Sequence, residues 1–64
     1  MKNIYTKATK ENLNKLLNMG CSFAIDTEQG LLSGDFIAVN SYGNLYSFSQ
    51  KMCIKEGLFF IENI

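Results

Sequence analysis

Cys21 and Cys53 are the residues of this sequence that could attack a substrate as nucleophiles. A thiol reacts as the thiolate, and enzymes activate it with a neighbouring base, most often a histidine. The chain of 64 residues contains no histidine, so a lysine or a carboxylate would have to take that role. We therefore predict that the protein is not an enzyme. A small thiol enzyme that works without histidine is kept as a third hypothesis.

Five acidic residues and four glycines are further candidates for a site, and they are Asp26, Glu28, Asp35, Glu56 and Glu62, and Gly30, Gly34, Gly43 and Gly57. Asp26 and Asp35 stand where turns need them, the other carboxylates are typical of a solvated surface, and the glycines are typical of turns. Acid–base catalysis by two carboxylates needs a cleft, which a chain of this length hardly offers. The glycines form no phosphate-binding loop with a lysine behind it, and the paired ligands of a structural zinc are missing. We predict no catalytic residue, no cofactor and no metal.

The two cysteines admit two structural interpretations. A Cys21–Cys53 disulfide would close a loop of roughly thirty residues and add about 3 kcal/mol to stability. Alternatively, both are reduced thiols of a cytoplasmic protein. No apolar signal segment follows Met1, and the longest apolar run is far shorter than a membrane span,. We therefore expect a cytoplasmic protein.

One helix is the clearest element that could position these groups. It follows a short predicted strand over residues 2–7. Thr9 offers a hydroxyl that can cap a helix, and Gly20 supplies the left-handed residue that ends one,. The leucines between them recur at helical spacing, and they are Leu13, Leu16 and Leu17,. A helix of about ten residues is marginal alone in water, so this leucine stripe must pack on a sheet.

Four further strands are predicted after the helix, over residues 21–26, 35–40, 45–49 and 58–62,. Turns are expected at residues 27–30 and 41–44, and residues 31–34 have no assignment. Residues 50–56 are interpreted as a polar connection that includes a helical turn. The last strand is apolar on both faces and is expected to be central or covered on both sides. The sequence thus predicts one α+β domain over residues 1–64, in the order β-α-β-β-β-β. One helix would pack on a four- to five-stranded, mainly antiparallel sheet.

One helix cannot cover both faces of such a sheet. The expected core is Ile4, Leu13, Leu16, Leu17, Phe23, Ile25, Ile37, Val39, Phe48, Phe59 and Ile61. The candidate interaction face takes the remaining large side chains, which are Tyr5, Phe36, Tyr42, Leu45, Tyr46, Leu58 and Phe60. Surplus apolar surface on so small a domain favours association, either with another protein or with a second copy as a homo-oligomer. The alternative is that the C-terminal connection folds over this face.

Nucleic-acid binding is the second hypothesis. Single-strand binders stack bases on exposed sheet aromatics beside cations, and Tyr5, Tyr42 and Tyr46 could form such a platform. The net charge of zero, the absence of arginine and the lack of a basic stripe weigh against it,. Protein binding is therefore preferred.

The order of these motifs resembles small accessory proteins of tailed phages. The resemblance is carried by residues 8–13 (ATKENL) leading into a leucine helix that ends at Gly20, and by residues 36–46 (FIAVNSYGNLY). Members with an assigned function tend to bind and disable or redirect a host protein, as anti-defence and anti-CRISPR inhibitors do. The resemblance implies that role, in the host cytoplasm, and it assigns no functional residue.

Overall fold

The computed structural model describes residues 3–64, so Lys2 of the first predicted strand lies outside the described residues. Helix α1 spans Lys10–Asn18 and confirms the clearest prediction. The Thr9 side chain accepts a hydrogen bond from the Asn12 N–H at 3.1 Å. Gly20 follows the helix with a φ of 94°, a value that glycine adopts without strain,. Leu13 and Leu16 are fully buried, so the helix is held by its apolar stripe.

The sheet is mixed rather than antiparallel throughout. Its strands are β1 (Ile4–Lys7), β2 (Ser22–Phe23), β3 (Phe36–Val39), β4 (Asn44–Phe48) and β5 (Phe59–Phe60), in the spatial order β2-β4-β3-β1-β5. The central pairs β1–β3 and β3–β4 are antiparallel, and the two-residue edge strands β2 and β5 pair in parallel. The α+β class is confirmed as a five-stranded sheet with three short helices in residues 3–64.

Two helices occupy segments where the sequence analysis expected connections. Helix α2 spans Glu28–Ser33, across the predicted turn and the unassigned segment, and helix α3 spans Gln50–Lys55. The Thr27 and Ser49 side chains cap them by accepting backbone N–H bonds three residues ahead,. Each helix has six residues, which is too short for an apolar repeat to stand out.

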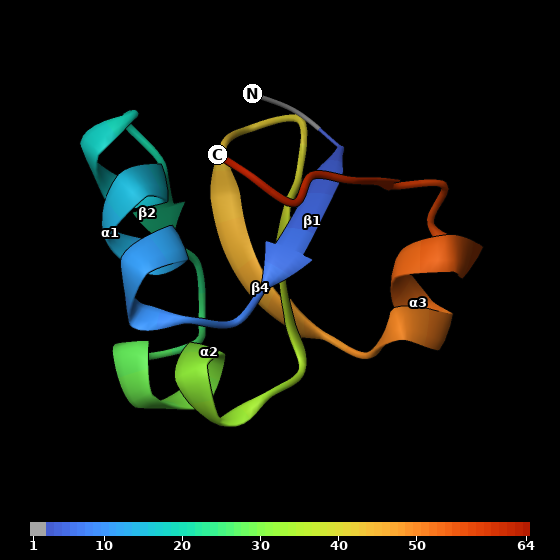
Figure 1. Ribbon diagram of the computed structural model, residues 1–64, viewed down its shortest axis with the longest axis horizontal. Coiled ribbons are helices and arrows are strands. Elements are labelled where there is room, and N and C mark those ends of the chain that lie inside the picture. Colours follow the sequence, from blue (N-terminus) through green and yellow to red (C-terminus); the bar gives the residue numbers. More distant parts are fainter. Residues whose placement is uncertain (1–2) are drawn as a thin grey trace.

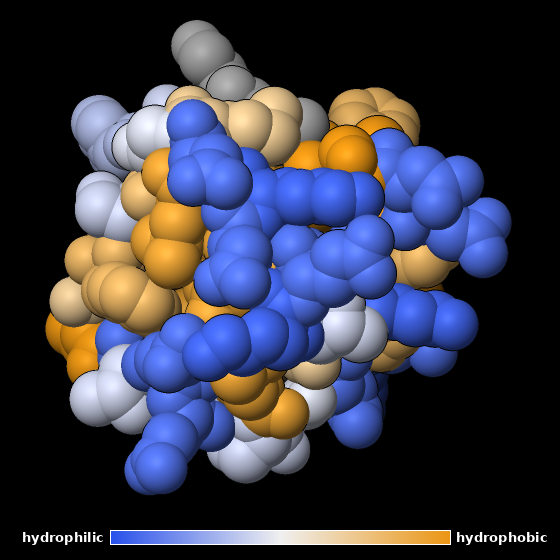
Figure 2. Space-filling view, turned by 60° about the vertical axis from the view of Figure 1, so that its left-hand side comes forward, coloured by the Kyte–Doolittle hydropathy of each residue, from blue (hydrophilic) through white to orange (hydrophobic). Residues whose placement is uncertain are grey.

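The molecule has three layers, with α1 and α2 on one side of the sheet and α3 on the other (Figure 1). The core cluster beneath α1 and α2 consists of Leu13, Leu16, Cys21, Leu31, Ile37, Val39 and Leu45. The cluster beneath α3 consists of Tyr5, Ala38 and Cys53, with Phe36, Tyr46, Phe48 and Leu58 packed against it. The C-terminal segment runs from α3 back across the end of the sheet, and Ile64 packs on the first cluster. Figure 2 shows the side of α1 and α2, where hydrophilic side chains cover most of the centre.

Three residues of the expected core are exposed instead. The exposed fractions of Phe23, Ile25 and Phe59 are 40%, 88% and 73%. Phe59 belongs to an edge strand, so the expectation that the last strand is central or covered was wrong. Phe48, expected under α1, faces α3. Alternation identifies the two faces of a strand, but it does not show whether anything covers either face.

Strand β2 is short because a side chain replaces it along the edge of β4. The Asp26 carboxylate accepts a hydrogen bond from the Ser47 N–H at 3.0 Å. This contact satisfies a backbone donor that a longer β2 would have bonded. The chain is then free to leave the sheet and enter α2, which leaves Ile25 exposed.

Gly34 marks the closest approach between the end of α2 and the sheet, and replacing it with alanine is expected to destabilise the protein. An added Cβ would overlap the Ser47 Oγ, whereas one at Gly30 meets only ordinary contacts. We expect Gly34→Ala to lower the free energy of unfolding by about 1–3 kcal/mol. A Ser47→Ala change in that background should recover most of the loss. Urea unfolding of both single variants and the double variant measures this coupling.

Gly30→Ala is the matched control for this cycle. Gly30 lies inside α2. There alanine is favoured over glycine by up to about 1 kcal/mol. Purely additive effects of the Gly34 and Ser47 substitutions would contradict the overlap.

Candidate protein-binding surface

Three aromatic rings meet on the sheet face that carries α3. The ring centroids of Tyr5 and Phe36 are 5.2 Å apart, those of Tyr5 and Phe60 are 5.3 Å apart, and those of Phe36 and Phe60 are 6.2 Å apart. The strand pairing explains this arrangement. Tyr5 lies directly beside Phe60 in the β1–β5 pair. Phe36 lies beside Lys7 in the β1–β3 pair, and Lys7 and Tyr5 are two residues apart on the same face of β1,. Tyr5 is 7% exposed and forms the floor, while Phe60 is 42% exposed.

Helix α3 crosses the middle of this face. Cys53 points inward and is fully buried in the cluster with Tyr5 and Ala38. Burial raises the pKa of the Cys53 thiol, which therefore stays protonated at neutral pH,. Cys21 lies in the cluster on the opposite side of the sheet, and both thiols are free. Of the two interpretations, the free thiols are therefore correct and the disulfide is not.

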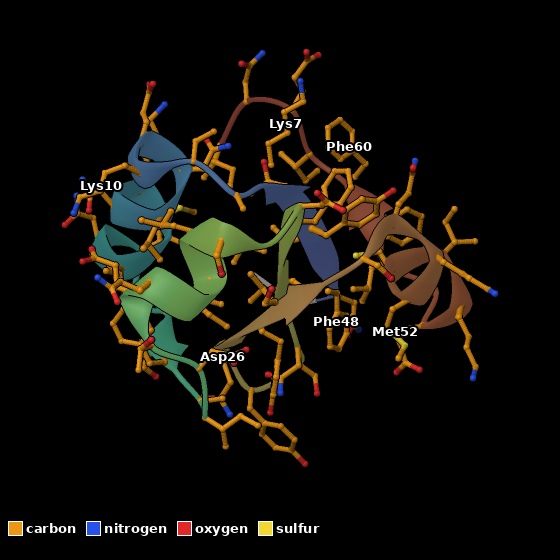
Figure 3. All side chains as sticks on the ribbon, turned by 90° about the horizontal axis from the view of Figure 1, so that it is seen from below. Lys7, Lys10, Asp26, Phe48, Met52 and Phe60 are labelled. Atoms are coloured by element: carbon orange, nitrogen blue, oxygen red, sulfur yellow. The ribbon has the colours of Figure 1, made fainter. Side chains whose placement is uncertain are left out.

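Both flanks of α3 carry exposed apolar side chains. Consecutive residues of an α-helix are about 100° apart around its axis, so Met52 and Ile54 flank the inward Cys53. Their exposed fractions are 39% and 65%. In Figure 3, Phe48 and Met52 lie on one side of α3, and Phe60 lies with Lys7 on the other. The helix thus covers the centre of the face and leaves apolar surface on both sides.

A groove of about 260 Å³ opens beside α3. Its lining residues are Asn3, Ala38, Val39, Asn40, Tyr46, Phe48, Glu56 and Leu58. The Tyr46 and Phe48 rings stack with centroids 5.8 Å apart and an interplanar angle of 29°. The Asn40 Nδ2 donates a hydrogen bond of 3.4 Å to the Tyr46 hydroxyl and so orients that ring.

The end of α3 places two of these lining residues. The Leu58 N–H donates to the Cys53 carbonyl at 3.0 Å, and the Gly57 N–H donates to the Ile54 carbonyl at 3.1 Å. This is a Schellman motif, and the φ of 71° at Gly57 supplies its left-handed residue,. The turn holds Glu56 at the rim of the groove and returns Leu58 to the sheet.

Five of the seven predicted interaction residues lie on this face, and two do not. Tyr5, Phe36, Tyr46, Leu58 and Phe60 lie there, although Tyr5 is buried beneath the others. Tyr42 is 86% exposed in the turn between β3 and β4. Leu45 is fully buried under α1 and α2, because it precedes Tyr46 and adjacent strand residues point to opposite faces,. The prediction that Leu45 belongs to the face was wrong.

Three residues that were not predicted also lie on this face, and they are Phe48, Met52 and Ile54. We define the α3 surface as Phe36, Tyr46, Phe48, Met52, Ile54, Leu58 and Phe60. Met52 and Ile54 were overlooked because residues 50–56 were interpreted as a polar connection. A signal was present, since Ser49 can cap a helix and three consecutive apolar residues follow it at positions 52–54,.

The lysines divide between the two sides of the molecule. Lys10 pairs with Glu28 at 3.0 Å, and Lys15 pairs with Glu11 at 3.3 Å, both on the side of α1 and α2. Within residues 3–64, the remaining lysines form no ion pair, and they are Lys7, Lys51 and Lys55. No group of three or more metal-ligating side chains gathers in that part of the chain. None of its helices has the length and apolar character needed to cross a membrane.

Comparisons with protein-family models, with curated proteins and with solved structures found no match to this chain.

Proposed function

We propose that this protein is a non-enzymatic module that binds another protein through the α3 surface. The observation that carries the proposal is the incomplete cover of the second sheet face. One six-residue helix lies across it, and Met52, Ile54 and Phe60 stay 39%, 65% and 42% exposed around that helix. The resemblance to phage accessory proteins adds the expected role, which is to inhibit or redirect a host protein in the host cytoplasm, as anti-defence and anti-CRISPR proteins do.

The chain is small, and this limits how much apolar surface it can bury by folding alone. A domain of about 60 residues buries only about 60% of the surface that its unfolded form exposes. Large apolar side chains outside the core contribute little to its folding, whereas covering them gains about 25 cal/mol per Å². Exposed apolar side chains that gather on one face in this way are typical of interfaces. A second copy of the chain could cover the same surface. Light scattering over a concentration series distinguishes such a homo-oligomer from a monomer.

The nucleic-acid hypothesis gains no support from the arrangement of the tyrosines. Tyr5 is buried, Tyr46 lines the groove, and Tyr42 lies in the β3–β4 turn. Successive bases need adjacent exposed rings, and these three do not form such a row. Lys51 and Lys55 stand on the outer side of α3, where the only apolar neighbour lining their shallow hollow is Met52.

Capture from a host lysate tests the proposed function. The tagged chain is expected to retain a specific protein after nuclease treatment and a high-salt wash, because apolar contacts depend little on salt. Binding through phosphates would weaken steeply as salt rises. In a parallel capture without nuclease, recovery of RNA or DNA alone, lost at high salt, would overturn the proposal.

A further inference from the structure

The groove beside α3 combines three kinds of chemistry within one small space. Its floor is apolar, from Ala38 and Leu58. One wall is the stacked pair of Tyr46 and Phe48, whose rings are only 29° from parallel. Among residues 3–64, the charged residue that lines the groove is Glu56. Such a set favours a ligand that has an apolar stem and a cationic end.

The size of the groove indicates a single side chain. Pockets for metabolites and cofactors usually measure about 300–1,000 Å³ and enclose most of the ligand. This groove is smaller, at about 260 Å³, and it is open to solvent beside the C-terminal end of α3, where Glu56 lines it. An open slot of this size suits one long side chain presented by a protein.

The electrostatics of the rim point to a cation. Within residues 3–64, no lysine forms an ion pair with the Glu56 carboxylate. The nearest cations in sequence are Lys51 and Lys55, which helical geometry turns away from the buried side of α3,. The faces of aromatic rings also attract cations. The Glu56 carboxylate and the two aromatic rings therefore both favour a cationic ligand.

We propose that this groove receives an arginine side chain of the protein partner. The inference rests on the proposed function and names the chemistry that its surface recognises. A guanidinium is planar and can lie against the Tyr46–Phe48 pair while it donates two parallel hydrogen bonds to the Glu56 carboxylate. A lysine ammonium is a compact, strongly hydrated point charge and cannot make that bidentate contact.

The polar groups on the rim determine how the arginine is held. The Asn40 Oδ1 already accepts from the Tyr42 and Asn44 N–H groups at 2.9 and 3.0 Å. Its Nδ2 donates to the Tyr46 hydroxyl. Asn40 is thus a positioning residue that fixes the ring, and Glu56 supplies the ionic contact.

Titration of the labelled protein with N-acetyl-arginine amide, followed by NMR, tests the groove without the partner. Saturable shifts are expected at the amides of Ala38, Asn40 and Leu58. The citrulline analogue keeps the shape and loses the charge, and it should bind roughly tenfold more weakly, since the aromatic and ionic contributions each fall. Glu56→Gln should weaken arginine binding about two- to fivefold.

Glu62→Gln is the matched control, because Glu62 is a C-terminal carboxylate outside the groove. It should bind the arginine probe as the parent does. Equal binding of citrulline, equal binding of N-acetyl-lysine amide, or an unchanged affinity in Glu56→Gln would overturn the arginine site. If the probe fails while the α3 surface still binds a protein, only this inference falls. If the probe binds but no protein is captured, the proposed function falls instead.

Discussion

Replacing Leu45 with alanine is expected to lower the free energy of unfolding by about 2–5 kcal/mol. Leu45 is fully buried between the sheet and helices α1 and α2, so the change removes buried methyl groups and leaves a cavity. A domain of this size has a total stability of only a few kcal/mol. We therefore expect a largely unfolded chain at room temperature, measured by circular dichroism and by urea unfolding.

Tyr42→Ala is the control for Leu45→Ala. Tyr42 is 86% exposed in the neighbouring turn, and its removal should change stability by less than about 0.5 kcal/mol,. The sequence pattern alone assigned both residues to one binding face. Similar small losses in both variants would show that Leu45 is not in the core and would contradict the fold.

Replacing Tyr5 with alanine is expected to cost about 3–5 kcal/mol, which is comparable with the loss at Leu45. Tyr5 is 7% exposed and its ring contacts both Phe36 and Phe60. The substitution removes the ring against which Phe60 of the edge strand β5 packs. Thermal unfolding measures the loss. Faster hydrogen exchange should accompany it at the Phe59 and Ile61 amides, which donate to the Asn3 and Tyr5 carbonyls,.

Tyr5→Phe separates the ring from its hydroxyl. No buried polar atom within residues 3–64 lacks a hydrogen-bond partner, so the Tyr5 hydroxyl, which has no partner there, reaches solvent at the edge of the buried ring. We expect this variant to lose less than about 1 kcal/mol and to keep the protection of β5. A loss as large as that of Tyr5→Ala would show that the ring packing is not what stabilises the α3 surface.

The parts of the fold that follow from local signals could be predicted from the sequence. Helix α1 was delimited by Thr9 and Gly20, which lie where the structure has its N-cap and its left-handed residue. The facing of β3 was also correct, with Ile37 and Val39 on one side and Phe36 on the other. On β4 only Tyr46 was assigned to its observed face, whereas Leu45 and Phe48 were each assigned to the opposite one. Helix caps and strand alternation are determined by residues that are close together in the sequence, so they can be recognised without the structure.

The parts that depend on long-range pairing could not be predicted. Phe59 and Phe60 have the composition of a central strand, but only the parallel pairing with β1 places them at an edge. Strand β2 ends early because Asp26 reaches Ser47, a contact across 21 positions in sequence. Nothing in the sequence around Asp26 or around Ser47 indicates that the two residues are in contact.

The candidate site shows the same division. The sequence identified the rings of Phe36, Tyr46 and Phe60 by their alternation, and the structure places them on one face. Residues 50–56 were assigned no more than a helical turn, and the face was expected either to stay open or to be covered by the C-terminal connection. The structure lies between the two, with helix α3 flanked by two strips of apolar surface. The groove and its carboxylate arise from that helix and were not foreseen.

Capture from the host lysate by two matched isoleucine variants tests the central proposal most directly. Ile54 and Ile25 are 65% and 88% exposed, and only Ile54 belongs to the α3 surface. Both variants should fold, as circular dichroism can verify, because neither residue is in the core. The account predicts that Ile54→Glu loses the captured protein and that Ile25→Glu retains it. Retention of the captured protein by a folded Ile54→Glu variant would contradict it.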